Sequence, residues 1–143
     1  MENETDSGQK WKKSILIVDD DESLVIGLTR RLIRHVGVIP ACSASEAMKL
    51  LQTASNIGAV ATDLKMPGKD GIELLNYVQE KFPKKPRILF TGHIDFLDVM
   101  KSIDSIELTA LLFKPLDPSL ILEYACGIRP AQTSAIADAI WSM

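Results

Sequence analysis

Five short apolar runs occur along the chain, and each is followed by a longer stretch in which apolar and polar residues alternate. A continuous apolar run is typical of a strand that is covered on both faces, as in a parallel sheet. The strands predicted in this way are residues 14–18, 38–42, 57–63, 87–91 and 108–113. We expect the second strand to lie at a sheet edge, because Pro40 has no amide hydrogen to donate to a neighbour.

The stretches between the strands repeat their apolar residues every three or four positions, which is typical of helices packed on one face. They cover about residues 22–37, 44–54, 70–82, 96–103 and 118–126. Residues that suit a helix N-cap precede three of them: Asp21, Ser43 and Asp117. Ser43 also forms a capping-box pattern with Glu46, and Gly37 and Gly127 mark helix ends. This alternation predicts one α/β domain with a parallel sheet and helices on both faces.

Composition and charge narrow the class of protein. The chain has 143 residues, and 46% of them are hydrophobic. This is enough for a stable core that needs no disulfide bond or structural metal ion. Its net charge of −3 gives no electrostatic basis for binding nucleic acid or an anionic membrane. No apolar run approaches the roughly 20 residues of a membrane span. We therefore expect a cytoplasmic domain in which Cys42 and Cys126 are buried thiols, with a disulfide between them as the alternative.

The two ends of the chain differ from its centre. Residues 1–12 are polar and are expected to be disordered, whereas residues 13–127 form the expected domain. Residues 128–143 contain Ala, Ile and Trp and are interpreted as a linker or contact helix. We favour a domain cut from a longer protein over a stand-alone one.

Polar side chains follow four of the five predicted strands where each strand ends. Asp19 and Asp20 follow the first, Asp63 ends the third, Thr91 ends the fourth and Lys114 follows the fifth. The carboxyl ends of parallel strands share one edge of the sheet, and ligands bind there where the strand order reverses. We therefore expect these five residues to meet at one place.

The chemistry of this set favours a metal and a phosphoryl group. Close carboxylates repel one another unless a hard divalent cation such as Mg²⁺ neutralises them. With the metal bound, a phosphoryl donor can approach, and Asp63 can act as a nucleophile that forms an aspartyl phosphate. Lys114 and the metal would stabilise the charge on the transferred group, and Thr91 would donate a hydrogen bond to it.

Four motifs, "ILIVDDD", "DLKMPGKDG", "LFTG" and "FKP", occur in this order within residues 14–126. Together they resemble the receiver domain of two-component response regulators. The resemblance implies a flavodoxin-like (βα)5 three-layer sandwich, with a five-stranded parallel sheet of order 2-1-3-4-5. It also implies a signalling domain rather than an enzyme, whose only reactions are its own phosphorylation and dephosphorylation.

The resemblance assigns metal ligands and a phosphoryl donor. Asp20 corresponds to the direct Mg²⁺ ligand and Asp19 to the acid that acts through water. Asp63 and the backbone carbonyl of Lys65 would complete the protein's ligands. The donor would be a histidine kinase or a histidine phosphotransfer protein.

The resemblance also assigns the transfer and switching residues. Asp63 corresponds to the phosphoacceptor, Thr91 to the switch hydroxyl and Lys114 to the lysine of the site, with a cis bond to Pro115. The chain departs from the family at Leu111, where the family normally has an aromatic side chain that swings inward behind the switch hydroxyl. A conformational switch that depends on this aromatic movement is therefore less expected here.

Two side chains beside the site form a separate hypothesis. Lys65 and His93 each lie two residues after a site residue, and positions of this kind tend to tune the lifetime of the acyl phosphate in this family. We expect a long cation and an imidazole there to change the access of water to the phosphoryl group.

Two other functions remain as alternatives. Asp19 and Asp21 have the spacing of the nucleophile and acid of haloacid dehalogenase-type phosphatases, but the late acidic pair and the cap domain of that family are missing. A degenerate receiver that acts only as a binding scaffold is disfavoured by the complete set of site residues. The output domain or protein is unknown, and the residues indicate no direct nucleic-acid or membrane partner. A weak homodimer through residues 96–103, 108–113 and 118–126 is expected from the family.

Overall fold

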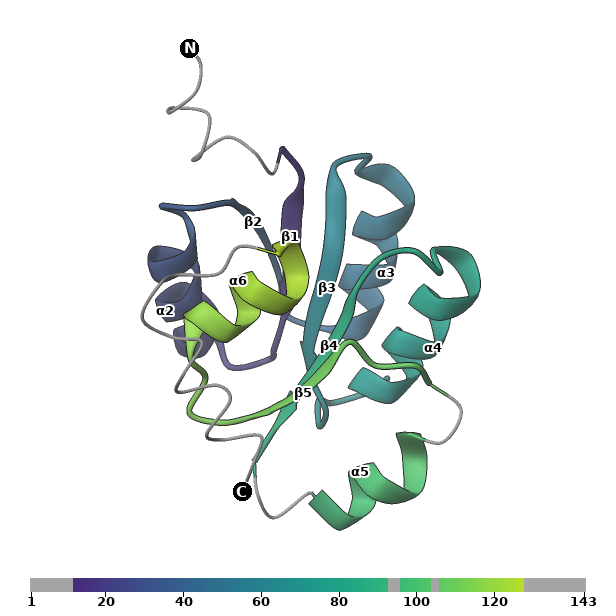
Figure 1. The fold of residues 1–143 in the computed structure, drawn as a ribbon. Helices are drawn as coiled ribbons and strands as arrows, with labels where there is room; N and C mark the ends of the chain where they lie inside the picture. The colour runs from purple at the N-terminus through teal and green to yellow at the C-terminus, as the bar shows by residue number, and fades with distance from the viewer. Residues whose placement is uncertain (1–11, 93–95, 104–105, 128–143) are drawn as a thin grey trace.

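Five parallel strands form a single sheet at the centre of the molecule (Figure 1). The structure, a computed structural model, describes residues 12–92, 96–103 and 106–127. The strands are β1 (Ser14–Val18), β2 (Gly37–Ala41), β3 (Ile57–Asp63), β4 (Arg87–Thr91) and β5 (Ala110–Phe113). Their order is β2-β1-β3-β4-β5, which confirms the flavodoxin-like arrangement.

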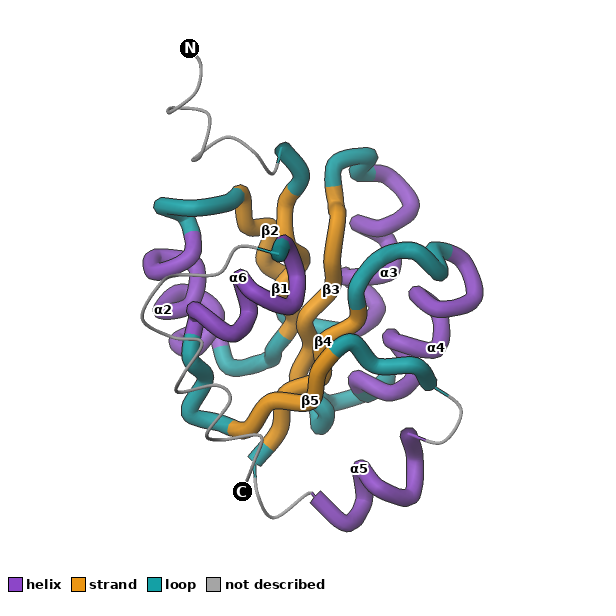
Figure 2. The backbone as a smooth tube through the Cα atoms, viewed as in Figure 1, coloured by secondary structure: helices purple, strands orange, loops and turns teal. Residues whose placement is uncertain are grey.

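Helices cover both faces of this sheet (Figure 2). They are α2 (Glu22–Leu32), α3 (Ala44–Thr53), α4 (Gly71–Lys81), α5 (Phe96–Ser102) and α6 (Pro118–Cys126). Apolar residues of α2 and α6 pack with one face of the sheet, and those of α3, α4 and α5 pack with the other. The result is the three-layer sandwich that the alternation of strands and helices predicts.

The central strands are buried on both faces, which explains their continuous apolar runs. In β1, Ile15 and Ile17 belong to the cluster under α2 and α6, whereas Leu16 and Val18 belong to the cluster under α3 and α4. This alternation follows from the pleat of a strand, in which neighbouring side chains point to opposite faces. A slip by one residue would exchange the two faces, so the burial fixes the register and aligns the strand ends.

The edge position of β2 is confirmed. Among the described residues, this strand pairs only with β1, and its Pro40 is exposed. The missing amide of Pro40 therefore removes no bond from the interior of the sheet.

The predicted boundary between the first helix and the second strand is wrong. The α2 helix ends at Leu32, five residues earlier than expected, and β2 begins at Gly37. Gly37 pairs with Ser14 at the start of β1, so the chain must leave the helix early to enter the sheet in this register. Val36 is still buried, as its place in the apolar stripe predicts.

The last strand is also shorter than predicted. It begins at Ala110 rather than at residue 108, although the Thr109 amide donates to the carbonyl oxygen of Arg87 at 2.7 Å. The other predicted helices and strands agree with the structure to within one or two residues.

Three helices begin at the predicted caps, with one difference. Asp21 and Asp117 accept backbone N–H groups of the first turns of α2 and α6. Ser43 accepts the Glu46 amide at 3.1 Å, but the Glu46 carboxylate accepts the Cys42 amide instead of closing the capping box. The complete capping box lies at the start of α4.

The expectation for the cysteines is wrong for Cys42. Its side chain is exposed directly after the edge strand β2. Desolvation raises the pKa of the thiol, and the negative charges of Glu22 and Glu46 add to this effect. Cys126 is half-buried, and burial raises the pKa of its thiol to about 12. Both thiols are free, so the disulfide alternative is also excluded.

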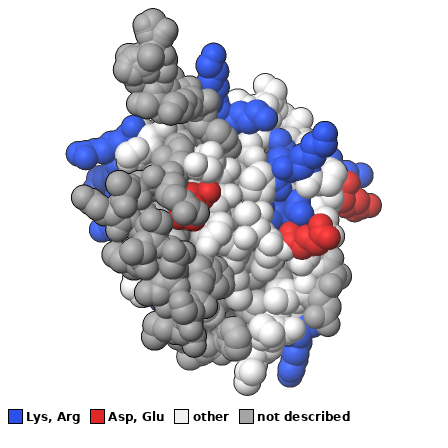
Figure 3. Space-filling view, viewed as in Figure 1, with Lys and Arg blue, Asp and Glu red and all other residues white. Residues whose placement is uncertain are grey.

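The surface and the two ends complete the description. On the face in Figure 3, basic side chains stand at separate places and acidic ones lie beside some of them. Within the described part of the chain, no helix is long and apolar enough to cross a membrane. Residues 1–11 and 128–143 lie outside the described residues, so the expectations for both ends stay predictions.

Candidate functional site

Three carboxylates converge at the carboxyl edge of the sheet. Asp19 and Asp20 follow β1, and Asp63 is the last residue of the neighbouring strand β3. One carboxylate oxygen from each of them lies within 4.8 Å of the other two. Asp19 and Asp63 are buried, at 1% and 7% exposure, while Asp20 is exposed to solvent. The cluster therefore opens outward on the Asp20 side.

Lys114, which directly follows the edge strand β5, contacts two of these carboxylates. Its ammonium nitrogen lies 3.1 Å from Oδ2 of Asp19 and 3.3 Å from Oδ2 of Asp63. The Lys114 amide donates to the carbonyl oxygen of Thr91 at 2.9 Å, which holds the residue at the end of β4. The bond to Pro115 is cis, as the resemblance implies.

Local backbone contacts orient the two buried carboxylates. Oδ1 of Asp63 accepts the Leu64 amide at 2.9 Å, and Oδ1 of Asp19 accepts the Asp21 amide at the same distance. Each carboxylate thus has one oxygen bound to its own loop and the other directed to Lys114. The order of residues after each strand sets this orientation.

The negative charges of the cluster repel one another. Burial, and next the negative charge of Asp19, raise the pKa of Asp63 to about 6, although Lys114 lowers it in part. Burial also lowers the pKa of Lys114, but its hydrogen bonds and charge contacts with Asp19 and Asp63 outweigh that and raise it. One ammonium does not compensate three carboxylates, so the site favours further positive charge.

The donor set fits Mg²⁺. Three carboxylates supply only hard oxygen ligands, which this ion prefers, and the exposed side at Asp20 leaves room for the waters that it retains. Oxygen ligands of an octahedral Mg²⁺ lie about 3–4 Å apart, close to the spacing of this cluster. Asp19, Asp20 and Asp63 are therefore brought together as the sequence predicts.

The structure places the remaining predicted residues as follows. Thr91 is fully buried at the end of β4, and its hydroxyl donates to the carbonyl oxygen of Gly92 at 3.3 Å. The Lys65 side chain is exposed, and its backbone follows Asp63 by two residues. Leu111 is half-buried and packs with the core under α4. His93 lies outside the described residues.

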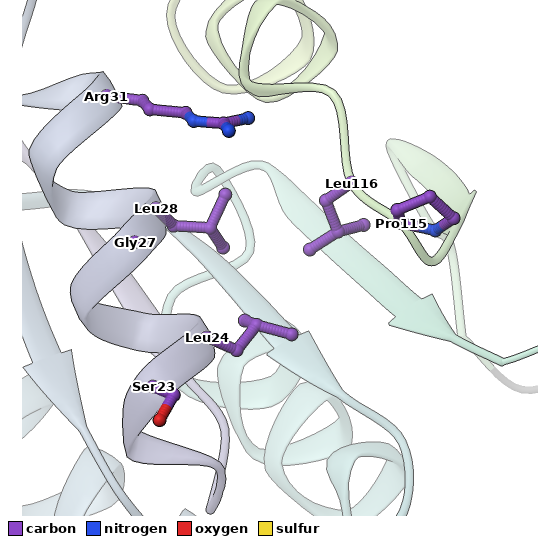
Figure 4. A pocket seen from close by; sticks show the side chains of 7 residues that line it. All are labelled: Ser23, Leu24, Gly27, Leu28, Arg31, Pro115 and Leu116. Atoms are coloured by element: carbon purple, nitrogen blue, oxygen red, sulfur yellow. The ribbon is translucent and has the colours of Figure 1, made fainter.

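A hollow of about 230 Å³ beside the site was not predicted from the sequence (Figure 4). Leu24 and Leu28 of α2 point across it toward Leu116, and Arg31 stands at one end. Two of its lining residues, Pro115 and Leu116, directly follow Lys114 in the chain. Its residues come from two distant segments, and no local pattern could have indicated it.

A comparison with protein families shows the family of the chain. The sequence profile of the response regulator receiver domain matches residues 15–125. The chain belongs to this family. A receiver domain is a signalling domain, the family generally uses Mg²⁺, and it implies a histidine kinase partner. The haloacid dehalogenase alternative is therefore not supported.

Individual relatives agree with this assignment. HoxA, the hydrogenase transcriptional regulatory protein of Cupriavidus necator, is 29% identical over 110 residues, 77% of this receiver domain chain and 23% of HoxA. FixJ, a transcriptional regulatory protein of Bradyrhizobium diazoefficiens, is 29% identical over 132 residues, 90% of this chain and 63% of FixJ. The chain thus spans less than two thirds of these relatives.

A solved structure shows the same fold at a similar identity. The signal receiver domain of an HD domain-containing protein from Pseudomonas fluorescens Pf-5 superimposes with a TM-score of 0.71 and 29% identity. The superposition covers 78% of this chain and 90% of that one.

Proposed function

We propose that this receiver domain accepts a phosphoryl group on Asp63 in a Mg²⁺-dependent reaction and controls an output through the resulting change in conformation. The donor is a histidine kinase or a histidine phosphotransfer protein. The observation that carries the proposal is the position of the Lys114 ammonium, 3.1 Å from Asp19 and 3.3 Å from Asp63, beside an acidic cluster that opens to solvent. The domain is then a phosphoacceptor that catalyses only its own phosphorylation and dephosphorylation.

The residues have distinct roles in this proposal. Asp19, Asp20, Asp63 and the carbonyl of Lys65 would hold Mg²⁺. The ion, when bound, neutralises the carboxylates and the phosphoryl oxygens so that two anions can approach. Lys114 contributes a second positive charge at the same place.

The phosphoryl group passes directly from the donor histidine to Asp63. An oxygen of Asp63 forms a bond to phosphorus while the bond between phosphorus and the donor imidazole breaks. The electron pair of that bond stays on the imidazole nitrogen, which takes up a proton. Thr91, whose hydroxyl is bonded to the carbonyl of Gly92 before transfer, turns to donate to a phosphoryl oxygen. This exchange of partners couples the site to the loop after β4.

The hollow between α2 and the segment after β5 is proposed as the docking site of the donor protein. It is apolar at Leu24, Leu28 and Leu116 and adjoins Lys114. A donor histidine has to reach Asp63, so its protein must rest on a surface next to the cluster.

A weak homodimer of the phosphorylated domain is a further proposal. Leu97 and Met100 on α5 are 72% and 48% exposed, which leaves an apolar surface on this helix. We expect sedimentation velocity to show a concentration-dependent dimer after phosphorylation and a monomer before it. Substituting Leu97→Glu should abolish the dimer, and an unchanged dimer would contradict this interface.

Acetyl phosphate labelling tests the proposed function. The chain is incubated with acetyl phosphate and Mg²⁺, and intact-protein mass spectrometry measures the gain of one phosphoryl group. We expect labelling of the wild type and of the exposed-surface control Glu80→Gln, and none of Asp63→Asn or of samples with EDTA. Absence of labelling in the wild type would favour the scaffold alternative. Labelling of Asp63→Asn would place the acceptor elsewhere.

A further inference from the structure

The first residue of α4, Gly71, lies directly against the backbone of the proposed phosphoacceptor. A Cβ atom on Gly71 would lie 2.1 Å from the carbonyl oxygen of Asp63, 3.0 Å from its carbonyl carbon and 3.1 Å from Cα of Leu64. All three atoms belong to the main chain, so no rotation of a side chain can relieve the contact. Only a residue without a side chain fits here.

The need for glycine at this position comes from space and not from backbone conformation. Among the described glycines, positive φ angles occur at Gly68 and Gly127, whereas Gly71 has the conformation of an ordinary helix start. Alanine could therefore adopt the backbone of Gly71 without strain. Its methyl group would instead push against Asp63.

Hydrogen bonds connect this contact to the site. The Gly71 amide donates to the carbonyl oxygen of Leu64 at 2.8 Å. The Leu64 amide is shared between the carboxylate of Asp63, at 2.9 Å, and the carbonyl oxygen of Phe90 in β4, at 3.0 Å. The start of α4, the turn after β3 and the end of β4 therefore form one hydrogen-bonded unit around the carboxylate.

The helix cannot easily retreat from an added methyl group. Its start is fixed by the capping box, in which Asp70 and Glu73 exchange hydrogen bonds of 2.9 and 3.0 Å. Its inner face is anchored by Leu74, Leu75 and Val78, all fully buried. Much of the displacement would thus fall on residues 63–65.

We propose that Gly71 is a positioning residue, which allows α4 to begin against the Asp63–Leu64 peptide and so fixes where the acceptor carboxylate stands. The same contact sets the carbonyl of Lys65, one of the proposed metal ligands. The inference rests on the proposed function of Asp63 and deepens it. A displacement of about 1 Å at a reacting group can lower a rate by about 100-fold.

The test compares Gly71→Ala with the matched control Val78→Ala. The control removes core contacts from the same helix and lowers stability, but it does not touch Asp63. Three quantities are measured where circular dichroism shows each variant to be folded. They are the Mg²⁺ dissociation constant by calorimetry, the chemical shift of the Leu64 amide, and the rate constant of labelling by acetyl phosphate at saturating Mg²⁺.

We expect Gly71→Ala to bind Mg²⁺ more weakly, to shift the Leu64 amide resonance and to be labelled about 10- to 100-fold more slowly, while Val78→Ala stays close to wild type. Wild-type affinity and rate in Gly71→Ala, or equal losses in Val78→Ala, would overturn the inference. If Gly71→Ala is unfolded in buffer, all samples are measured with trimethylamine N-oxide, which favours the folded state. A wild type that is not labelled contradicts the proposed function instead, and the Mg²⁺ and amide measurements still test the position of Gly71.

Discussion

At the scale of single residues, Asp63 combines burial with a neighbouring negative charge. Its pKa is raised from 3.8 to about 6, mainly by burial and then by Asp19. Asp63 therefore binds a proton more tightly in the folded state than in the unfolded state. The resulting stabilisation is complete below about pH 4 and is lost as the pH rises through 6. At neutral pH the metal-free domain carries an unfavourable charge that its proposed function requires.

The substitution Asp63→Asn should accordingly stabilise the metal-free domain at pH 8. Asparagine keeps the oxygen that accepts the Leu64 amide and removes the charge. Two units of pKa correspond to about 3 kcal/mol, but solvent screens this partly exposed site, so we expect a gain of about 1 kcal/mol. Thermal melts in EDTA should show a melting temperature higher by a few degrees at pH 8, with little difference at pH 4. A lower melting temperature at pH 8 would contradict the electrostatic account.

Lys65 and His93 form a second prediction at this scale. If their side chains control the access of water to the phosphoryl group, Lys65→Ala and His93→Ala should change the half-life of phosphorylated Asp63. The loss of radioactive phosphate after removal of the donor measures this half-life. The exposed Lys84→Ala serves as a control. Half-lives equal to that of the wild type in both variants would end the hypothesis.

At the scale of elements, Arg87 fastens two loops at the edge of the sheet opposite to the site. Its buried guanidinium donates to the carbonyl oxygens of Glu107, Pro83 and Lys85 at 2.9 to 3.1 Å. The backbone amide of Arg87 donates to the hydroxyl oxygen of Thr109 at 2.9 Å. Arg87 thus fastens the segment before β5 to the start of β4.

The substitution Arg87→Lys should destabilise the fold without altering the chemistry. Lysine keeps the positive charge but lacks the several N–H donors of the planar guanidinium group. It therefore leaves buried carbonyl oxygens without a donor, which should lower the free energy of unfolding by about 1–3 kcal/mol. Urea unfolding measures the loss. The labelling rate of the folded protein should remain at the wild-type value, because Arg87 lies at the far end of β4 from Thr91. A slower rate in fully folded protein would show that the two edges are coupled.

At the scale of the whole molecule, the metal should couple the site to global stability. An ion that binds only the folded state at about 100 times its dissociation constant stabilises that state by about 2.7 kcal/mol. We expect Mg²⁺ to raise the melting temperature of the wild type and of Glu80→Gln, but much less that of Asp20→Ala. An equal rise in Asp20→Ala would place the ion elsewhere.

The pattern of apolar and polar residues was enough to predict the alternation of strands and helices, the parallel sheet and the set of residues at its carboxyl edge. The runs of β1, β3 and β4 are continuous because both faces of these strands are buried. Asp19, Asp63, Thr91 and Lys114 lie where the first, third, fourth and fifth runs end. Parallel strands bring such ends together, so the pattern was sufficient to predict the cluster.

Features that depend on two segments far apart in the chain could be seen only in the folded molecule. The pairing of Gly37 with Ser14 requires α2 to end early. Cys42 is exposed because it follows a strand at the edge of the sheet. The close approach of α4 to Asp63 leaves no room for a side chain at Gly71. These outcomes depend on register and on the space between packed elements. A local pattern of apolar and polar residues carries neither quantity.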